Sequence, residues 1–187
     1  MQENAPAPRV QIVPVGKVEP ALLDYLALAL PAGVGGPCAV LPKGIDPRDA
    51  FDARRQQYNS TRLLALLSAV PLPEGSRALG VADVDLFIPI LTFVFGEAQL
   101  GGRAAVFSAT RLKQEYYGLP RDEVLFYERC EKEALHELGH THGLVHCPSY
   151  ACVMHYSNSV EDVDVKSAAW CPDCAVKRLG ERSCTKT

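Results

Sequence analysis

The sequence lacks an excess of positive charge, and this argues against a function in binding nucleic acids. The 187 residues carry 19 Lys and Arg against 22 Asp and Glu, which gives a net charge of −3. Proteins that bind nucleic acids present a basic surface, because contacts with phosphates supply much of the affinity. We therefore expect no nucleic-acid partner.

Long apolar runs and a secretory signal are also missing. The closest approach to a membrane span, residues 22–30, contains Asp24 and stops at Pro31, so it is too short. The N-terminal segment MQENAPAPRVQIVPVG has no cationic start followed by an apolar stretch. We expect no membrane partner, a cytoplasmic location and, by default, a monomer.

Cysteine, by contrast, is plentiful. The sequence has seven cysteines, an odd number, and the lack of an export signal favours thiols or metal ligands over a disulfide framework. Cys38 and Cys130 stand alone, whereas the other five lie beyond residue 146. Buried or free thiols are our default for Cys38, Cys130 and Cys184.

The apolar pattern predicts alternating strands and helices. Strands are expected at residues 10–15, 38–41, 78–84, 93–95 and 103–107. Helices are expected at residues 19–30, 59–70 and 121–142, the first ended by Pro31 and the second by Pro71. Pro14 argues for an edge or strand-end position. The whole predicts an α/β (α+β) fold: a mixed, largely parallel sheet with flanking helices, and a hairpin of the last two strands at an antiparallel edge.

The composition changes at Gly143. Beyond it Cys, Pro, Ser and Asn are frequent and apolar periodicity is lost. We therefore expect two parts, an N-terminal α/β subdomain over residues 1–143 that includes the last predicted helix, and a small, irregular C-terminal subdomain over residues 144–187.

The helix predicted at residues 121–142 leads into the sequence HELGHTHGLVH, which has the spacing of a catalytic metal site. His136 and His140 are four residues apart, so their imidazoles lie one turn apart on one helix face and can share an ion. Gly143 can adopt the left-handed backbone that ends a helix, so that the chain turns and His146 reaches the same ion. Three neutral histidines leave a fourth position of zinc open for water, as in catalytic sites.

Glu137, between the first two histidines, is the candidate general base. Zinc lowers the pKa of bound water to about 7, so Glu137 could accept a proton as the water attacks a peptide carbonyl, and pass it to the leaving amine. The alternative is a chance HExxH on an amphipathic helix, which the placement of His146 makes remote. His142 is not at a ligand spacing and is predicted to be a surface or supporting residue.

The cysteines of the tail predict a second, structural metal site. Cys147 and Cys152 form one close pair, Cys171 and Cys174 form another, and 18 residues separate the pairs. This spacing is typical of a closed zinc site with four thiolates, so the chain should bind two Zn²⁺ ions. A redox pair at Cys171 and Cys174 is disfavoured because no βαβ pattern surrounds it. Paired disulfides remain an alternative.

With HExxHxxGxxH followed directly by Cys, then by Cys-x-Met and by CxxC, the chain resembles the archaemetzincins, zinc metallopeptidases of the metzincin clan. The resemblance covers residues 136–174 closely. It implies a metzincin-like fold, a catalytic zinc at the three histidines, a structural zinc at the four cysteines, and Met154 in the Met-turn beneath the catalytic metal.

Two further roles are hypotheses. Some metzincins have a tyrosine near zinc two residues after the turn methionine, and Tyr156 would likewise stabilise the transition state; the alternative is a tyrosine packed in the turn. The strand at residues 103–107 is the candidate for the upper rim of the cleft, where an extended peptide could add through main-chain hydrogen bonds. The alternative there is a strand inside the sheet.

These features predict a zinc metallopeptidase that acts on peptides or unfolded protein segments. Two other functions stay open: a zinc-stabilised peptide-binding module with little or no turnover, and a hydrolase of a non-peptide amide. Glu137 favours the enzymes, because a binding module needs no general base.

Overall fold

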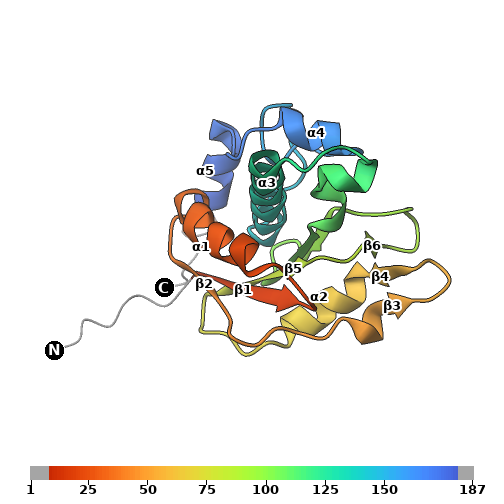
Figure 1. Cartoon of the computed structure of the whole chain (residues 1–187). Coiled ribbons are helices and arrows are strands. Elements are labelled where there is room, and N and C mark those ends of the chain that lie inside the picture. Colours follow the sequence, from red (N-terminus) through yellow and green to blue (C-terminus); the bar gives the residue numbers. More distant parts are fainter. Residues whose placement is uncertain (1–8, 181–187) are drawn as a thin grey trace.

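A five-stranded sheet forms the centre of the computed structural model, which describes residues 9–180 (Figure 1). Its strands are β1 (Val10–Val15), β2 (Cys38–Val40), β5 (Arg77–Ala82), β7 (Gly96–Ala98) and β8 (Ala104–Ser108). They lie in the order β2-β1-β5-β8-β7, with β7 antiparallel to β8 and all other pairs parallel. The predicted mixed, largely parallel sheet with an antiparallel edge is confirmed.

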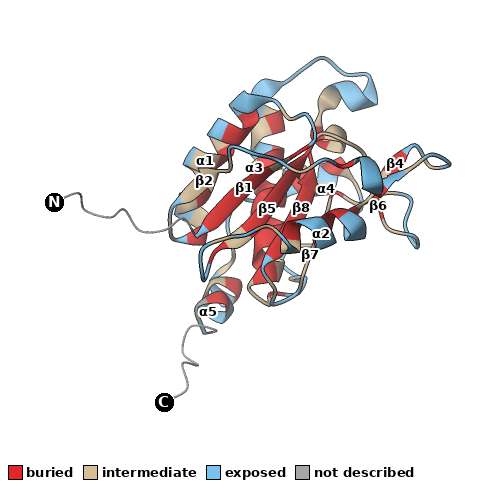
Figure 2. Ribbon diagram, turned by 90° about the horizontal axis from the view of Figure 1, so that it is seen from below, coloured by how far each residue is buried: buried red, intermediate tan, exposed pale blue. Residues whose placement is uncertain are grey.

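Helices cover both faces of this sheet, because successive strand residues point to opposite faces and both sets are apolar. Helices α1 (Pro20–Val34) and α3 (Glu123–Thr141) lie on one face and α2 (Ser60–Ser68) lies on the other (Figure 1). In β1, Ile12 packs in the core under α1 and α3, whereas Val13 and Val15 pack in the core under α2. The central strands are therefore buried on both sides (Figure 2).

Smaller elements complete the described chain. A second sheet has the order β3-β4-β6, formed by β3 (Phe51–Asp52), β4 (Gln57–Asn59) and β6 (Leu86–Phe87). Short 3₁₀ helices lie at Arg48–Ala50, Thr110–Leu112 and Gln114–Tyr117. The tail is not wholly irregular, since it contains α4 (Val160–Val165) and α5 (Pro172–Gly180). The division of the chain at residue 143 stays a prediction.

Pro31 was a misleading guide to the end of the first helix, whereas Pro14 does lie near a strand end, one of the two positions predicted for it. Helix α1 does not end at Pro31 but runs to Val34, which is buried in the core, and it ends at Gly35 with φ +69°. Strand β1 is not an edge strand, because β2 and β5 flank it. Pro14 is nevertheless near the strand end, and β2 pairs with β1 only as far as Ile12. The missing N–H of Pro14 therefore falls beyond the β1–β2 ladder.

The predicted hairpin is present but displaced. Strand β8 matches the prediction at residues 103–107, whereas its partner is Gly96–Ala98 and not residues 93–95. The prediction followed the β-rich side chains of Phe93 and Phe95, which instead form an edge-to-face aromatic pair with ring centroids 5.3 Å apart. The helices expected at residues 59–70 and 121–142 are confirmed as α2 and α3.

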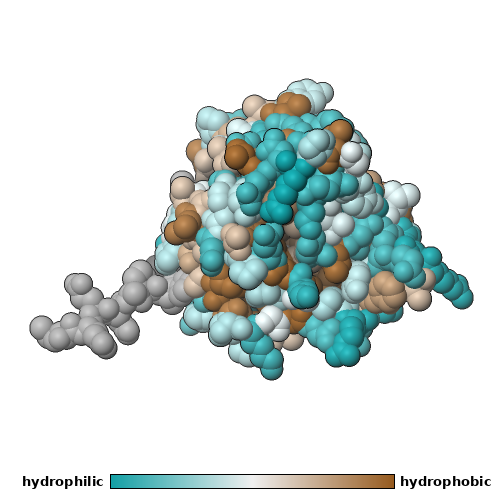
Figure 3. All heavy atoms as spheres, viewed as in Figure 1, coloured by the Kyte–Doolittle hydropathy of each residue, from teal (hydrophilic) through white to brown (hydrophobic). Residues whose placement is uncertain are grey.

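Because most large apolar side chains are buried in the core, the surface is mainly hydrophilic. On the face drawn in Figure 3, hydrophobic side chains form small groups among hydrophilic ones. Within residues 9–180, no helix combines the length and apolar character needed to cross a membrane.

Candidate active site

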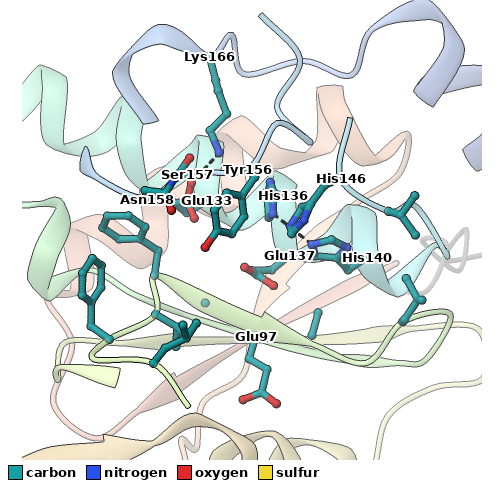
Figure 4. A pocket seen from close by; sticks show the side chains of 18 of the residues that line it. Glu97, Glu133, His136, Glu137, His140, His146, Tyr156, Ser157, Asn158 and Lys166 are labelled. Atoms are coloured by element: carbon teal, nitrogen blue, oxygen red, sulfur yellow. Dashed lines mark hydrogen bonds and ion pairs between the residues drawn. The ribbon is translucent and has the colours of Figure 1, made fainter. Parts of the chain in front are cut away.

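The end of α3 brings the three histidines together. Gly143 has φ +80°, as predicted, and its N–H donates to His140 O while the N–H of Leu144 donates to Gly139 O. This paired closure of a helix end turns the chain back over the last turn. His146 thus comes to lie with its ring centroid 5.3 Å from that of His136 and 5.0 Å from that of His140 (Figure 4).

The orientation of two rings suits a cation. His136 Nδ1 lies 2.7 Å from Val153 O, and His140 Nδ1 lies 2.7 Å from Leu144 O. A carbonyl oxygen only accepts, so both Nδ1 atoms carry the proton and both Nε2 atoms present lone pairs. These two Nε2 atoms are 3.1 Å apart. Facing lone pairs at this distance repel unless a cation lies beside both, and the residues present therefore fit a zinc ion.

The ligand group is complete in geometry. One nitrogen from each of His136, His140 and His146 lies within 4.8 Å of the others. Burial lowers the pKa of all three imidazoles, which keeps them neutral and able to ligate. His142, which was not predicted to be a ligand, is the C-cap of α3 and lies outside this group.

Glu137 lies beside the histidines and is almost fully buried, with 4% of its surface exposed. Burial raises the pKa of its carboxyl well above the usual range, and the negative charge of Glu133 acts in the same direction. Lys166 acts against both. Its Nζ lies 3.0 Å from Glu133 Oε1 in a buried ion pair and also donates to His155 O at 3.2 Å. Glu133 thus has Lys166 as its cationic partner, whereas Glu137 forms no ion pair with any residue in the range 9–180.

A cleft of about 550 Å³ exposes this group to substrate. Residues 91–98 line one side of it, and Tyr156, Ser157 and Asn158 line another (Figure 4). The rim strand is β7 and not the predicted strand at residues 103–107, because β8 lies between β5 and β7 and has no free edge. The sequence pattern could not separate a rim strand from a strand inside the sheet, because it does not show which edges of a strand are paired.

Two residues after α3, Met154 and Tyr156, were predicted from the family resemblance, and both lie near the histidines. Tyr156 is 45% exposed, and its ring centroid lies 5.1 Å from that of His146. Met154 is fully buried and packs so closely on α3 that any side chain at Gly139 would overlap its sulfur. Val153 O, one residue earlier, accepts the bond from His136. This segment therefore supports the ligand helix directly.

The four predicted cysteines form a second group. All four Sγ atoms lie within 4.8 Å of one another, and those of Cys147 and Cys171 are 3.8 Å apart. A tetrahedral zinc with Zn–S bonds of about 2.3 Å has edges of about 3.8 Å, so the donor set fits this ion. The group adjoins the histidines, because Cys147 follows His146 and its N–H donates to Met154 O.

The remaining cysteines lie outside both groups or outside the described residues. Cys130 is fully buried on α3, and Cys38 is half-buried in β2. Burial raises the pKa of the Cys38 thiol to about 11. Cys184 lies outside the residues that the structure describes.

Several residues of the site were not predicted from the sequence. Glu133 and Glu137 are spaced like the two helical histidines, one turn apart, and this spacing was a usable signal. Lys166, Gly96 and Glu97 carried no comparable signal, because tertiary contacts alone bring them to the cleft.

Comparison with known proteins agrees with this geometry. The profile of Peptidase family M54 matches residues 49–179, a stretch that contains all seven proposed ligands. The archaemetzincin of Methanocaldococcus jannaschii is 42% identical over 174 residues, which cover 93% of this chain and 94% of that protein.

Solved structures agree as well. The crystal structure of archaemetzincin from Archaeoglobus fulgidus, complexed with malonate, has a TM-score of 0.78 and 41% identity and covers 90% of this chain and 98% of that chain. Archaemetzincin from Methanopyrus kandleri has a TM-score of 0.79 and 33% identity, with 100% of both chains covered. From its sequence, fold and ligand geometry, the chain therefore belongs to peptidase family M54 and is a zinc metallopeptidase of the archaemetzincin kind.

Proposed function

We propose that the chain hydrolyses peptide bonds with His136, His140 and His146 as ligands of a catalytic zinc and Glu137 as general base. The observation that carries this proposal is the placement of one buried carboxylate beside three converging imidazoles in an open cleft. When bound, the zinc supplies positive charge that polarises both a water molecule and the peptide carbonyl.

Glu137 handles the proton. Its carboxylate accepts a proton from the attacking water and delivers it to the nitrogen of the leaving amine. The raised pKa of the buried carboxyl favours holding that proton between the two steps, while a cation at the histidines favours the charged form before the reaction. The same residue can therefore serve as base first and as acid second.

Strand β7 supports the binding of an extended peptide. Among the described strands it pairs only with β8, so its other edge has free main-chain groups. An extended substrate can add to such an edge through main-chain hydrogen bonds, which recognise a peptide whatever its side chains. Because β7 lines the cleft, the added peptide would run past the histidines.

Two further roles belong to this proposal. Tyr156 donates its hydroxyl hydrogen to the oxyanion that develops on the peptide carbonyl, a role supported by its place beside His146 at the cleft. Cys147, Cys152, Cys171 and Cys174 hold a second, structural zinc, which brings the number of ions to two.

The test compares the native chain with Glu137→Gln on a mixture of peptides, with zinc counted in both proteins. We expect two zinc ions per chain in both and a loss of cleavage in the variant of at least about 100-fold, since a general base contributes about 10²–10⁴-fold. Glu128→Gln, on the exposed side of α3, is the matched control and should cleave normally. Two zincs without cleavage by the native chain would contradict the proposal and favour a binding module or a non-peptide amide substrate.

A further inference from the structure

Gly96 lies where the edge strand β7 passes closest to Glu137. A Cβ atom built on Gly96 would lie 2.5 Å from Oε1, 2.6 Å from Cγ and 2.7 Å from Cδ of Glu137. Real Cβ atoms essentially never come within 3.0 Å of such neighbours. The end of the Glu137 side chain therefore occupies the space that a side chain at position 96 would need.

The strand cannot easily move away from this contact. Glu97, the next residue, points away from the histidines (Figure 4) and accepts hydrogen bonds from Ser60 Oγ at 2.5 Å and Thr61 Oγ1 at 3.0 Å. These hydroxyls lie in the first turn of α2, where the helix dipole also favours a carboxylate. Beyond the end of β7, in the turn to β8, Gly101 N–H donates to His140 O at the end of α3. The edge strand is thus tied to helices on both faces of the sheet.

Glu137 has little room to retreat on its own side. It is almost fully buried, and the carboxylate of Glu133 lies one turn earlier on α3, held by Lys166. A displaced Glu137 carboxylate would have to leave its place between the edge strand and the histidines. It would then no longer face the attacking water, from which it must accept a proton.

We propose that Gly96 is a positioning residue: because it has no side chain, the edge strand leaves room for the Glu137 carboxylate beside the histidines, where it can act as general base. This inference rests on the proposed role of Glu137. A methyl group at position 96 would have to displace the Glu137 side chain beyond its Cβ atom, because Cγ and Cδ overlap with it as well as Oε1. The reaction should not tolerate it, since a misplacement of about 1 Å can cost about 100-fold in rate.

The chain offers a matched control in Gly80, which lies in β5 away from the cleft. A Cβ atom there would lie 2.5 Å from Leu67 Cδ1, an overlap as close as that of Gly96 with Glu137. For Gly96→Ala we expect kcat to fall at least about 100-fold, with KM within about threefold and the zinc content unchanged. For Gly80→Ala we expect the reverse, a lower Tm with kcat within about threefold of native.

Two measurements separate steric displacement from a general effect on the fold. In the background of Glu137→Ala, which removes the Cγ, Cδ and Oε1 atoms that overlap with position 96, adding Gly96→Ala should lower the residual kcat by less than about fivefold. A crystal structure of Gly96→Ala should show the Glu137 carboxylate moved by about 1 Å or more, and this readout needs no turnover.

The outcomes are distinct. Native kcat in Gly96→Ala, an equal loss in both backgrounds, or an unmoved carboxylate would each overturn the role of Gly96. If the native chain cleaves no peptide, the proposed function fails, and the position of the carboxylate in Gly96→Ala still decides whether Gly96 sets it.

Discussion

At the scale of single residues, the hydroxyl of Tyr156 offers a direct test of transition-state stabilisation. Tyr156→Phe removes one hydrogen-bond donor and leaves the ring that packs near His146. We expect kcat to fall by about 100-fold, the lower end of what the loss of one oxyanion donor costs, with zinc content and Tm unchanged. Peptide cleavage under saturating substrate measures this.

The control for that variant is Tyr150→Phe. Tyr150 is 72% exposed, its ring is tilted against that of His155, and it does not line the cleft, so its hydroxyl should not affect turnover. Full turnover by Tyr156→Phe would mean that Tyr156 only packs in the turn.

Site residues could be predicted from the sequence where they lie close together along the chain. The motif spacing alone was enough to propose His136, Glu137 and His140, because i and i+4 positions share a helix face. Glu133 and Lys166 form an ion pair across 33 residues, and Ser60 and Glu97 meet across 37. No periodicity encodes such pairs, so only the folded chain reveals them.

At the scale of elements, the buried pair of Lys166 and Glu133 joins α3 to the end of α4. Their side chains are 0% and 3% exposed, and Lys166 also donates to His155 O beside the Met-turn. Lys166→Met would leave the Glu133 charge buried without a partner. We expect the free energy of unfolding to fall by about 3–5 kcal/mol, measured by urea denaturation.

The double variant Lys166→Met/Glu133→Gln tests the cause. Removing both charges should restore part of the lost stability, because the cost comes from the unpaired carboxylate and not from the lost attraction. Arg121→Met is the control, since Arg121 pairs with Glu123 at the exposed surface and its loss should not measurably change stability. A double variant as unstable as Lys166→Met alone would point to packing of the lysine stem instead.

Elements were predicted well where burial and local pattern agree. Strand β1 is a short β-rich run of residues that is buried along almost its whole length. Helix α3 lies where it was predicted, although Val124, on its expected apolar face, is 70% exposed. Helix α1 continues past Pro31 because burial of Leu30 and Val34 favours one more turn. Strand β7 has the weak β-formers Gly, Glu and Ala, and it is a strand because β8 pairs with it and Glu97 anchors it to α2. Tertiary contacts therefore decided the part of the fold that borders the cleft.

At the scale of the whole molecule, the tail after the histidines contains two short helices and the group of four cysteines. Its helices α4 and α5 have 6 and 9 residues, lengths that are marginal without tertiary support. Cys152 and Cys174 are buried in the same core cluster as Leu30 of α1, and Arg178 of α5 donates to Val34 O at 2.9 Å. An ion at the cysteines would therefore join the tail to the core that carries the catalytic helix.

The last prediction separates the two proposed metal sites by their expected effects on zinc content and on stability. Cys171→Ser should lower the zinc content from two ions to one and the Tm by about 10 °C or more, because binding free energy at a structural zinc is folding free energy. His146→Ala should remove the other ion with a much smaller change in Tm, since the catalytic ligands are already held by α3 and its hydrogen bonds.

Metal analysis and calorimetry measure both quantities, and Cys38→Ser, which lies outside the cluster, should keep two ions and serves as the control. If Cys171→Ser kept both zincs, the cysteines would not be a zinc site. A mass four hydrogens below that of the fully reduced chain under non-reducing conditions would then assign them to two disulfides, which stabilise a chain mainly by limiting its unfolded state.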